Sequence, residues 1–223
     1  MPSIPEEIFK CMLSGDLETI QHLLEAEGVT EESTEQDGYN TTGQEDEVGR
    51  TVLVAAGLLG RSAIVPELVR RGAQVDHRTA RGYSSLHLAA CWGRVETVRT
   101  LLELGADTQT RTFRGQRPVD LARRYSHTAC ADLLLLAEAK QDLMSYVNFV
   151  KDFIADSEKN LTKEEKNICT RVCSDTLVWM QSVGNTTVSD ITAHREDMED
   201  TLQPVLSMHS AQSEMSVKPG GKV

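Results

Sequence analysis

The sequence predicts an all-α protein, in which a solenoid of stacked helical repeats is followed by a small antiparallel helical bundle. Two observations predict this fold class. Glycine-containing motifs recur at a fixed spacing in the middle of the chain, and stripes of apolar residues at helical spacing follow them. The chain of 223 residues is long enough for two small domains.

Residues 1–27 are expected to form a pair of capping helices before the repeats. Apolar residues fall on one side of a first short helix and then of a second, and Gly15 separates the two. A terminal unit of a solenoid is expected to depart from the pattern of the others. The apolar positions are Ile8, Phe9, Met12, Leu13, Leu17, Ile20, Leu23 and Leu24.

An acidic strip follows these helices. Residues 25–47 hold nine acidic residues and no basic one, a composition typical of disorder. We therefore expect residues 28–47 to be an acidic, disordered insertion. Residues 48–135 have the opposite character, because thirteen arginines and seven acidic residues give a net charge of +6 (13 − 7). One hypothesis is that the acidic strip folds back over this arginine-rich part and shields it.

Three phased patterns predict repeats over residues 48–138. In each pattern, equivalent residues are 33 positions apart, as in 82 − 49 and 115 − 82. The registers are Gly49, Gly82 and Gly115; Gly60, Gly93 and Ser126; and Arg71-Gly-Ala and Leu104-Gly-Ala. Three coincident registers at a period of this length are the signature of a stacked-repeat architecture.

Each unit has the composition of two short helices joined by tight turns. Gly82 stands where a turn needs a positive φ, and Ser84 is placed to cap the first helix. Gly93 ends that helix, and a second amphipathic helix is predicted to follow until Gly105. One such unit cannot bury its own apolar face, so neighbouring units must stack.

The run that begins each unit carries a resemblance. Ser84-Ser-Leu-His-Leu-Ala resembles the Thr-Pro-Leu-His-x-Ala motif of the ankyrin repeat, whose period is about 33 residues. The next unit keeps the proline of that motif as Pro118. The resemblance implies an ankyrin-repeat solenoid whose concave face binds other proteins. It also implies that His87 is a structural residue, hydrogen-bonded to the neighbouring turns.

Residues 139–209 are expected to form the antiparallel bundle. The last repeat reads on as a helix, and Thr162 and Glu165 then form the pattern of a capping box that starts a second helix. A third apolar stripe follows, and three amphipathic helices with short connections favour a bundle. Residues 210–223, which end in Lys-Pro-Gly-Gly-Lys-Val, are expected to be a disordered tail.

The bundle is similar to the helical lid at the C-terminal end of the seventy-kilodalton heat-shock chaperones. The similarity covers residues 142–208 and rests on Leu161-Thr-Lys-Glu-Glu-Lys, Trp179-Met and His194-Arg-Glu-Asp-Met-Glu. The chain has no counterpart of the nucleotide-binding and substrate-binding domains of those chaperones, which excludes ATP-driven folding. A lid of this kind implies contact with heat-shock chaperones or their clients.

The chain as a whole resembles a vertebrate family in which ankyrin repeats are joined to such a lid-like bundle. Cys91-Trp-Gly-Arg-Val-Glu-Thr and Ala122-Arg-Arg-Tyr-Ser-His carry this resemblance. It implies a link to cell division or cilia and brings no enzymatic chemistry.

Candidate binding residues occupy the positions that an ankyrin repeat leaves free, beside the turn glycine and at the end of the first helix. Aromatic residues alternate with arginines there, and tryptophan, tyrosine and arginine are enriched at interface hot spots. The candidate protein-binding residues are Arg81, Tyr83, Trp92, Phe113, Arg114, Arg124 and Tyr125. Arg81 and Arg114 are expected to be exposed, whereas packing of Trp92 between repeats is left open as an alternative.

The expected partner is a protein with an acidic or aromatic segment. Arginines would attract a polyanion, but the arginine-rich part contains no lysine and the rest of the chain is acidic, which disfavours nucleic acid. No apolar run approaches the roughly 20 residues that span a bilayer, so no membrane partner is expected. The start of the chain lacks a secretory signal, so we expect a cytoplasmic location, with cytoskeletal structures of dividing or ciliated cells implied by the family resemblance.

No catalytic, metal or cofactor site is predicted. Cys91, Cys130, Cys169 and Cys173 fall on or beside apolar helix faces, where cysteine behaves as a small hydrophobe. The leading interpretation is therefore a non-enzymatic adaptor with its partner on the concave ankyrin face and the bundle as a second contact or self-association surface. The alternative is a regulator that contacts heat-shock chaperones or their clients through the bundle, and an enzyme ranks third.

Overall fold

A computed structural model describes residues 4–27, 51–156, 161–182 and 186–215. In the described part, turns and loops connect helices and no strand is present, although an isolated β-bridge joins Arg78 and Ser84. This confirms the all-α fold class. The predicted acidic insertion at residues 28–47, and the hypothesis that it shields the arginines, lie outside the described residues. The chain divides into two compact units, residues 1–137 and residues 138–223.

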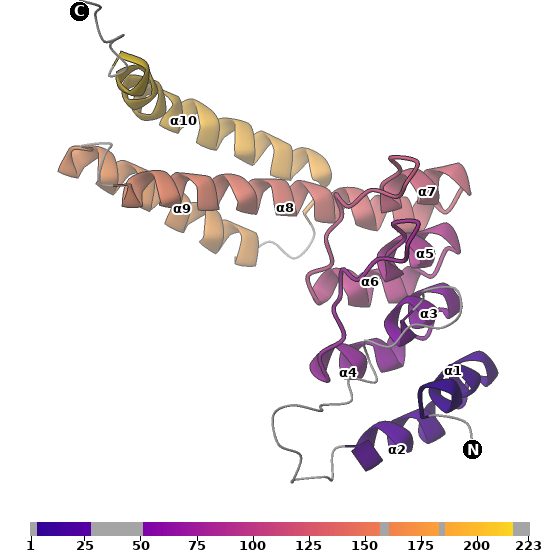
Figure 1. The fold of residues 1–223 in the computed structure, drawn as a ribbon. Coiled ribbons are helices and arrows are strands. Elements are labelled where there is room, and N and C mark those ends of the chain that lie inside the picture. Colours follow the sequence, from indigo (N-terminus) through magenta and orange to yellow (C-terminus); the bar gives the residue numbers. More distant parts are fainter. Residues whose placement is uncertain (1–3, 28–50, 157–160, 183–185, 216–223) are drawn as a thin grey trace, which may run out of the picture. The chain divides into compact units, whose positions relative to one another are not determined.

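The first unit is a two-layered stack of short helices (Figure 1). Helices α1, α3, α5 and α7 pack side by side in sequence order, and α4 packs on α6 in the second layer. The helices are α1 (Ile4–Ser14), α2 (Leu17–Glu27), α3 (Val52–Leu59), α4 (Val65–Arg70), α5 (Ser85–Cys91), α6 (Val95–Glu103), α7 (Pro118–Arg124) and the start of α8 (Thr128–Ala155), with a 3₁₀ turn η2 (Ser62–Ile64) before α4.

Small residues let the inner helices approach closely. A Cβ atom at Gly57 of α3 would lie 2.5 Å from the backbone oxygen of Ser85, so the contact between α3 and α5 requires glycine there. Ala56, Ala89 and Ala90 are fully buried in the same layer. The buried cluster of this unit runs from Ile8 to Leu134, so the N-terminal helix pair shares one continuous core with the repeats.

The turn between the two helices of each unit has left-handed backbone. Gly60 and Gly93 have φ values of 76° and 65°, and Ser126 takes the equivalent place with φ 60°. Ser126 is the one non-glycine residue with a positive φ in the part of the chain that the structure describes. The chain reverses there between α7 and α8 just as it does after α3 and α5.

The second unit consists of the C-terminal part of α8, α9 (Lys163–Ser182) and α10 (Val188–Met215). The predicted capping box is present, because the Thr162 backbone N–H donates to Glu165 Oε2 at 2.8 Å and the Glu165 N–H donates to Thr162 Oγ1 at 3.2 Å. Helix α9 runs antiparallel to α10, because Thr176 contacts Met198 while Glu165 contacts His209. Cys173 of α9 packs against Val147 of α8.

The predicted start of the tail at residue 210 is too early. Helix α10 continues to Met215, and the described residues end there. The physical reason is that neither glycine nor a second proline follows Pro204 until Pro219, so no residue in between breaks the helix. Pro204 itself lies inside α10 and did not mark its end.

Candidate protein-interaction surface

The turns that precede α5 and α7 are built alike and are joined to each other. In the first, the Gly82 N–H donates to the Thr79 carbonyl at 2.7 Å, and in the second the Gly115 N–H donates to the Thr112 carbonyl at 2.8 Å. The Phe113 N–H donates to the Arg81 carbonyl at 3.0 Å, which joins the two turns. These hydrogen bonds fix the backbones of the two turns, so the Cα positions of the residues on the turns are fixed as well.

His87 is completely buried and contacts both turns through its imidazole ring. Its Nε2 lies 3.1 Å from the Gln116 carbonyl, and its Nδ1 lies 2.9 Å from Ser84 Oγ and 3.2 Å from the Ser84 backbone N. A carbonyl only accepts hydrogen bonds, so Nε2 carries the proton and Nδ1 accepts from Ser84. Burial lowers the pKa of His87, which favours this neutral form. The structural role that the ankyrin resemblance implies for His87 is confirmed.

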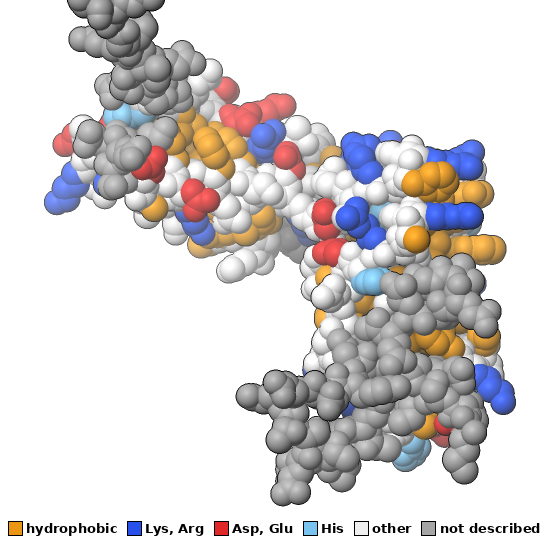
Figure 2. All heavy atoms as spheres, in the orientation of Figure 1, with side chains coloured by type: hydrophobic (Ala, Val, Ile, Leu, Met, Phe, Trp, Pro, Cys, Tyr) orange, Lys and Arg blue, Asp and Glu red, His pale blue; other side chains and the backbone are white. Residues whose placement is uncertain are grey.

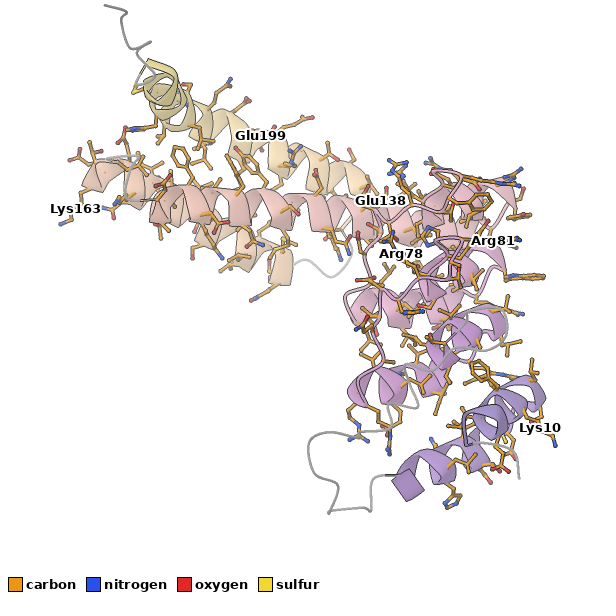
Figure 3. The ribbon with its side chains drawn as sticks, in the orientation of Figure 1. Lys10, Arg78, Arg81, Glu138, Lys163 and Glu199 are labelled. Atoms are coloured by element: carbon orange, nitrogen blue, oxygen red, sulfur yellow. The ribbon has the colours of Figure 1, made fainter. Side chains whose placement is uncertain are left out.

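Aromatic and arginine side chains meet on the two turns. The rings of Tyr83 and Phe113 lie 6.4 Å apart between centroids in a tilted arrangement. The guanidinium carbon of Arg114 lies 5.2 Å from the centre of the Phe113 ring, a cation–π geometry. Phe113 is nevertheless 60% exposed, and both Arg81 and Arg114 are exposed as expected. Figure 3 shows Arg81 on the turn that precedes α5.

A second row of candidates lies at the ends of the inner helices. Trp92 is the C-cap of α5 and Tyr125 is the C-cap of α7, so the two occupy equivalent places in successive repeats. Trp92 is 56% exposed and Tyr125 is 52% exposed. The open alternative for Trp92 is thus resolved towards exposure. Arg124 beside Tyr125 is also exposed.

The structure therefore groups four of the seven candidates on the turns and three at the helix ends. The turn group is Arg81, Tyr83, Phe113 and Arg114, and the helix-end group is Trp92, Arg124 and Tyr125. On the face shown in Figure 2, hydrophobic and basic side chains alternate along the side of the first unit that α5 and α7 form. We call these seven residues the aromatic–arginine face.

A row of polar side chains that joins the repeats was not recognised in the sequence. Arg61 donates to the Met12 carbonyl at 3.3 Å, Arg94 donates to the Leu58 carbonyl at 3.4 Å, and His127 Nε2 lies 3.1 Å from the Cys91 carbonyl. Each side chain directly follows a positive-φ residue and reaches the end of the preceding inner helix. The sequence signal for this row is the same spacing of 33 (94 − 61 and 127 − 94), but the residue type changes from arginine to histidine at the last position.

Four cysteine thiols have raised pKa values, which favours their protonated form. Burial raises the pKa of Cys130, Cys169 and Cys173. Burial also raises the pKa of Cys91, although a hydrogen bond with Tyr125 opposes the shift. Because the thiolate is the nucleophile and the metal ligand, these thiols are poorly suited to either role at neutral pH.

The described residues contain no group of three or more histidine, cysteine or acidic side chains arranged to hold a metal ion. Among the same residues, the helices that are long enough to span a bilayer are not apolar enough to do so.

Comparisons with known proteins agree with this architecture. A family model described as "Ankyrin repeats (3 copies)" matches residues 8–112, a range that begins within α1 and includes α2. The ankyrin repeat domain-containing protein 45 of Danio rerio is 44% identical over 95% of this chain and 95% of its own length. The human protein of that name is 33% identical over 87% of this chain and 73% of its own length.

The stacked helix pairs, the buried histidine and the linked turns define an ankyrin-repeat protein, a class whose repeats bind other proteins. Within that class, the similarity along nearly the whole chain is decisive. The chain belongs to the family of ankyrin repeat domain-containing protein 45.

Proposed function

We propose that the chain is a non-enzymatic adaptor that binds a partner protein on the aromatic–arginine face. One observation carries this proposal. Trp92 and Tyr125, which are both more than half exposed, occupy equivalent places of two successive repeats, and so do the exposed Arg81 and Arg114. Phe113, which is also more than half exposed, lies beside Arg114. Isolated exposed apolar residues are ordinary, but a set repeated in register with arginines has the composition of an interface hot spot.

The chemistry of the face favours an acidic and aromatic segment as its partner. Guanidinium groups pair with carboxylates in a two-pronged geometry, and aromatic rings bury large apolar areas worth about 25 cal/mol per Å². The linked turns limit the conformational entropy that binding costs. Nucleic acid is disfavoured because the chain carries a net charge of −11.

A displayed library of acidic, aromatic peptides tests this proposal. Peptides selected on the full chain are measured by calorimetry against wild type and against an Arg81→Glu/Arg114→Glu double variant. We expect the double variant to bind at least about 10-fold more weakly, because each reversal turns attraction into repulsion. The matched control is Arg99→Glu on α6, where Arg99 is exposed and pairs loosely with Glu96 at 3.6 Å. Equal weakening by the control and the face variant would contradict the proposal.

Loss of aromatic area gives an independent check. Trp92→Ala and Tyr125→Ala are each expected to weaken binding by about 1–2 kcal/mol, as at interface hot spots. Val178 of α9, which is 63% exposed in the second unit, supplies the control as Val178→Ala. Binding that is insensitive to both aromatic substitutions would place the partner elsewhere on the molecule.

The second unit supports an alternative partner. Residues 138–223 form a compact unit of their own. The similarity of sequence motifs in this unit to a chaperone lid favours contact with heat-shock chaperones or their clients. Binding of a purified seventy-kilodalton chaperone to the full chain, weakened by Val178→Ala and by Phe149→Ala but not by Arg81→Glu, would favour this alternative. Self-association through the bundle is checked by sedimentation of the same variants.

The cellular setting is part of the proposal. A cytoplasmic location at cytoskeletal structures of dividing or ciliated cells rests on the family resemblance. Proximity labelling with wild type and with the Arg81→Glu/Arg114→Glu variant tests it, because a true partner of the face should be labelled by the first and lost with the second.

A further inference from the structure

Four hydroxyl side chains in the sequence stand three residues after an arginine, namely Ser84, Thr97, Ser126 and Ser174. This arrangement matters because many serine kinases select substrates by charge, with acidic groups that bind arginines before the serine. Ser126 differs from the other three in having two arginines, Arg123 and Arg124, directly upstream at the third and second positions.

Burial and backbone separate the four further. Ser84 and Thr97 are each only 1% exposed, and Ser84 is hydrogen-bonded to His87. Ser174 is exposed but lies in the interior of α9, where a kinase could not extend the backbone without unfolding the helix. Ser126 is exposed and lies between α7 and α8, outside both helices.

Three backbone hydrogen bonds hold the turn around Ser126, together with His127, whose Nε2 lies 3.1 Å from the Cys91 carbonyl. The Tyr125 N–H donates to the Leu121 carbonyl at 3.1 Å, the Ser126 N–H to the Arg123 carbonyl at 3.1 Å, and the His127 N–H to the Ala122 carbonyl at 2.8 Å. Ser126 is also a non-glycine residue with φ 60°, a conformation that L-residues adopt at a cost. Local opening of this turn is therefore cheaper than opening a helix interior, and it presents Arg123, Arg124 and Ser126 in an extended form.

A phosphate on Ser126 would add negative charge next to the aromatic–arginine face. Ser126 follows Tyr125 and Arg124, two residues of the aromatic–arginine face, and a phosphoserine carries about −1.5 to −2 charges at neutral pH. That charge offsets the positive charge that Arg123 and Arg124 supply at this end of α7. The fold tolerates the group, because it precedes the N-terminus of α8, where negative charge is favoured.

We propose that Ser126 is a phosphorylation site for an arginine-directed serine kinase, and that phosphate there weakens binding of an acidic partner to the face. In this reaction the Ser126 Oγ attacks the γ-phosphorus of ATP, its proton passes to a carboxylate of the kinase, and ADP leaves. The site itself stands on the sequence and geometry around Ser126. The effect on binding rests on the function proposed above.

The first experiment locates the phosphate on the full chain. The catalytic subunit of cyclic-AMP-dependent protein kinase, a representative arginine-directed enzyme, is supplied with magnesium and ATP, and mass spectrometry assigns the modified residues. We expect Ser126 to be modified at least about 10-fold faster than Ser174, because a turn opens more readily than a helix interior. Ser84 and Thr97 should stay unmodified. An Arg123→Ala/Arg124→Ala variant should lose the reaction at Ser126, and Ser126→Ala controls for the assignment.

The second experiment measures the effect on the face. A fluorescent peptide of alternating glutamate and phenylalanine is titrated with the phosphorylated chain, the unmodified chain and the Arg81→Glu/Arg114→Glu variant. We expect phosphorylation to weaken the affinity several-fold, by about 3- to 10-fold at low salt, with a smaller effect at high salt.

Absence of phosphate on Ser126 of the folded chain, while a synthetic peptide of residues 119–130 is phosphorylated, would overturn the site. Unchanged affinity after phosphorylation, with weakening by the arginine variant, would overturn the effect on binding. If the arginine variant also binds normally, the proposed function fails and the effect on binding fails with it. In that last case a phosphate found on Ser126 still establishes the site.

Discussion

At the scale of single residues, polar groups buried between repeats hold the framework, and the exposed groups on the neighbouring turns are the ones that we propose for binding. His87 in the first turn of α5 and Phe113 on the turn that precedes α7 illustrate the division, because the first is completely buried whereas the second is 60% exposed. The difference follows from position in the repeat, since His87 lies inside α5 at the capping turn and Phe113 lies at the tip of the next turn. Substitutions at the two should therefore have separate effects.

His87→Ala is expected to destabilise the first unit without altering the face directly. The substitution leaves the Ser84 N–H without its partner and leaves the Gln116 carbonyl with the Thr112 N–H alone, at 3.0 Å. An unsatisfied buried group costs about 1–3 kcal/mol, and the cavity left by the imidazole adds to that cost. We expect a loss of about 3 kcal/mol in the free energy of unfolding, measured by urea denaturation. The exposed control Arg99→Ala should change it by less than about 0.5 kcal/mol. A small loss for His87→Ala would mean that water replaces the imidazole.

His87 should also make the stability of the first unit depend on pH. Burial lowers the pKa of His87 in the folded state, so the unfolded chain takes up the proton first as the pH falls below about 6.5. Its contribution to stability is therefore present at neutral pH and declines in acid. His87→Gln, which keeps a polar side chain but does not titrate, should lose less stability between pH 7 and pH 5 than wild type does.

At the scale of elements, local signals specify where helices begin and end. Thr162 and Glu165 predicted the start of α9, because a capping box is made by residues three positions apart and can be recognised in the sequence. The positive-φ residues marked the turns because that backbone conformation favours glycine. The late end of α10 was missed because the helix has no breaker near Met215.

Contacts between elements were less accessible to sequence reasoning. Arg94 and His127 reach carbonyls of the preceding repeat, and nothing local to either residue shows which carbonyl lies within reach. His209 of α10 lies 3.3 Å from Glu165, a residue 44 positions away. The seven candidate residues of the face could be chosen because the ankyrin pattern tells which positions point outward. Their exposure, and the contact of Phe113 with Tyr83 and Arg114, needed the structure.

The cap of α9 should make the second unit sensitive to acid. Hydrogen bonds from the backbone and side chain of Thr162, and then from His209, hold the pKa of Glu165 below its usual value. A carboxylate with a lowered folded-state pKa stabilises above its unfolded pKa, about 4.3, and this contribution is lost as the pH falls through the lower folded value. We expect thermal unfolding of α9, followed through Trp179 in a Trp92→Phe background, to shift down in that range. A Thr162→Val/Glu165→Ala variant should show a smaller shift, and an identical one would exclude the cap as its cause.

At the scale of the whole molecule, each of the two units has a buried set of its own. The first is the cluster from Ile8 to Leu134, and in the second Leu143, Val147 and Leu202 are fully buried. Helix α8 contributes Leu134 to the first set and Leu143 to the second, so one continuous helix belongs to both units. Stability in repeat proteins spreads mainly between neighbouring units. The effect of a destabilising substitution in the repeats should therefore decrease along α8 towards the second unit.

Gly57→Ala is such a substitution. Its Cβ would lie 2.5 Å from the Ser85 oxygen and 2.9 Å from the Ser85 Cα, so α3 and α5 must move apart at a cost of about 1–3 kcal/mol. In hydrogen exchange followed by mass spectrometry, we expect faster exchange in peptides from α3, α5 and α7 and unchanged exchange in peptides from α9 and α10. Peptides from the two ends of α8 should differ, with the change confined to the end that contains Leu134. The control is Gly105→Ala, because a Cβ there meets no atom within 4 Å and only the positive φ of 85° is strained. Uniform acceleration across α9 and α10 in Gly57→Ala would show that the two units unfold as one, and the adaptor would then present both surfaces or neither.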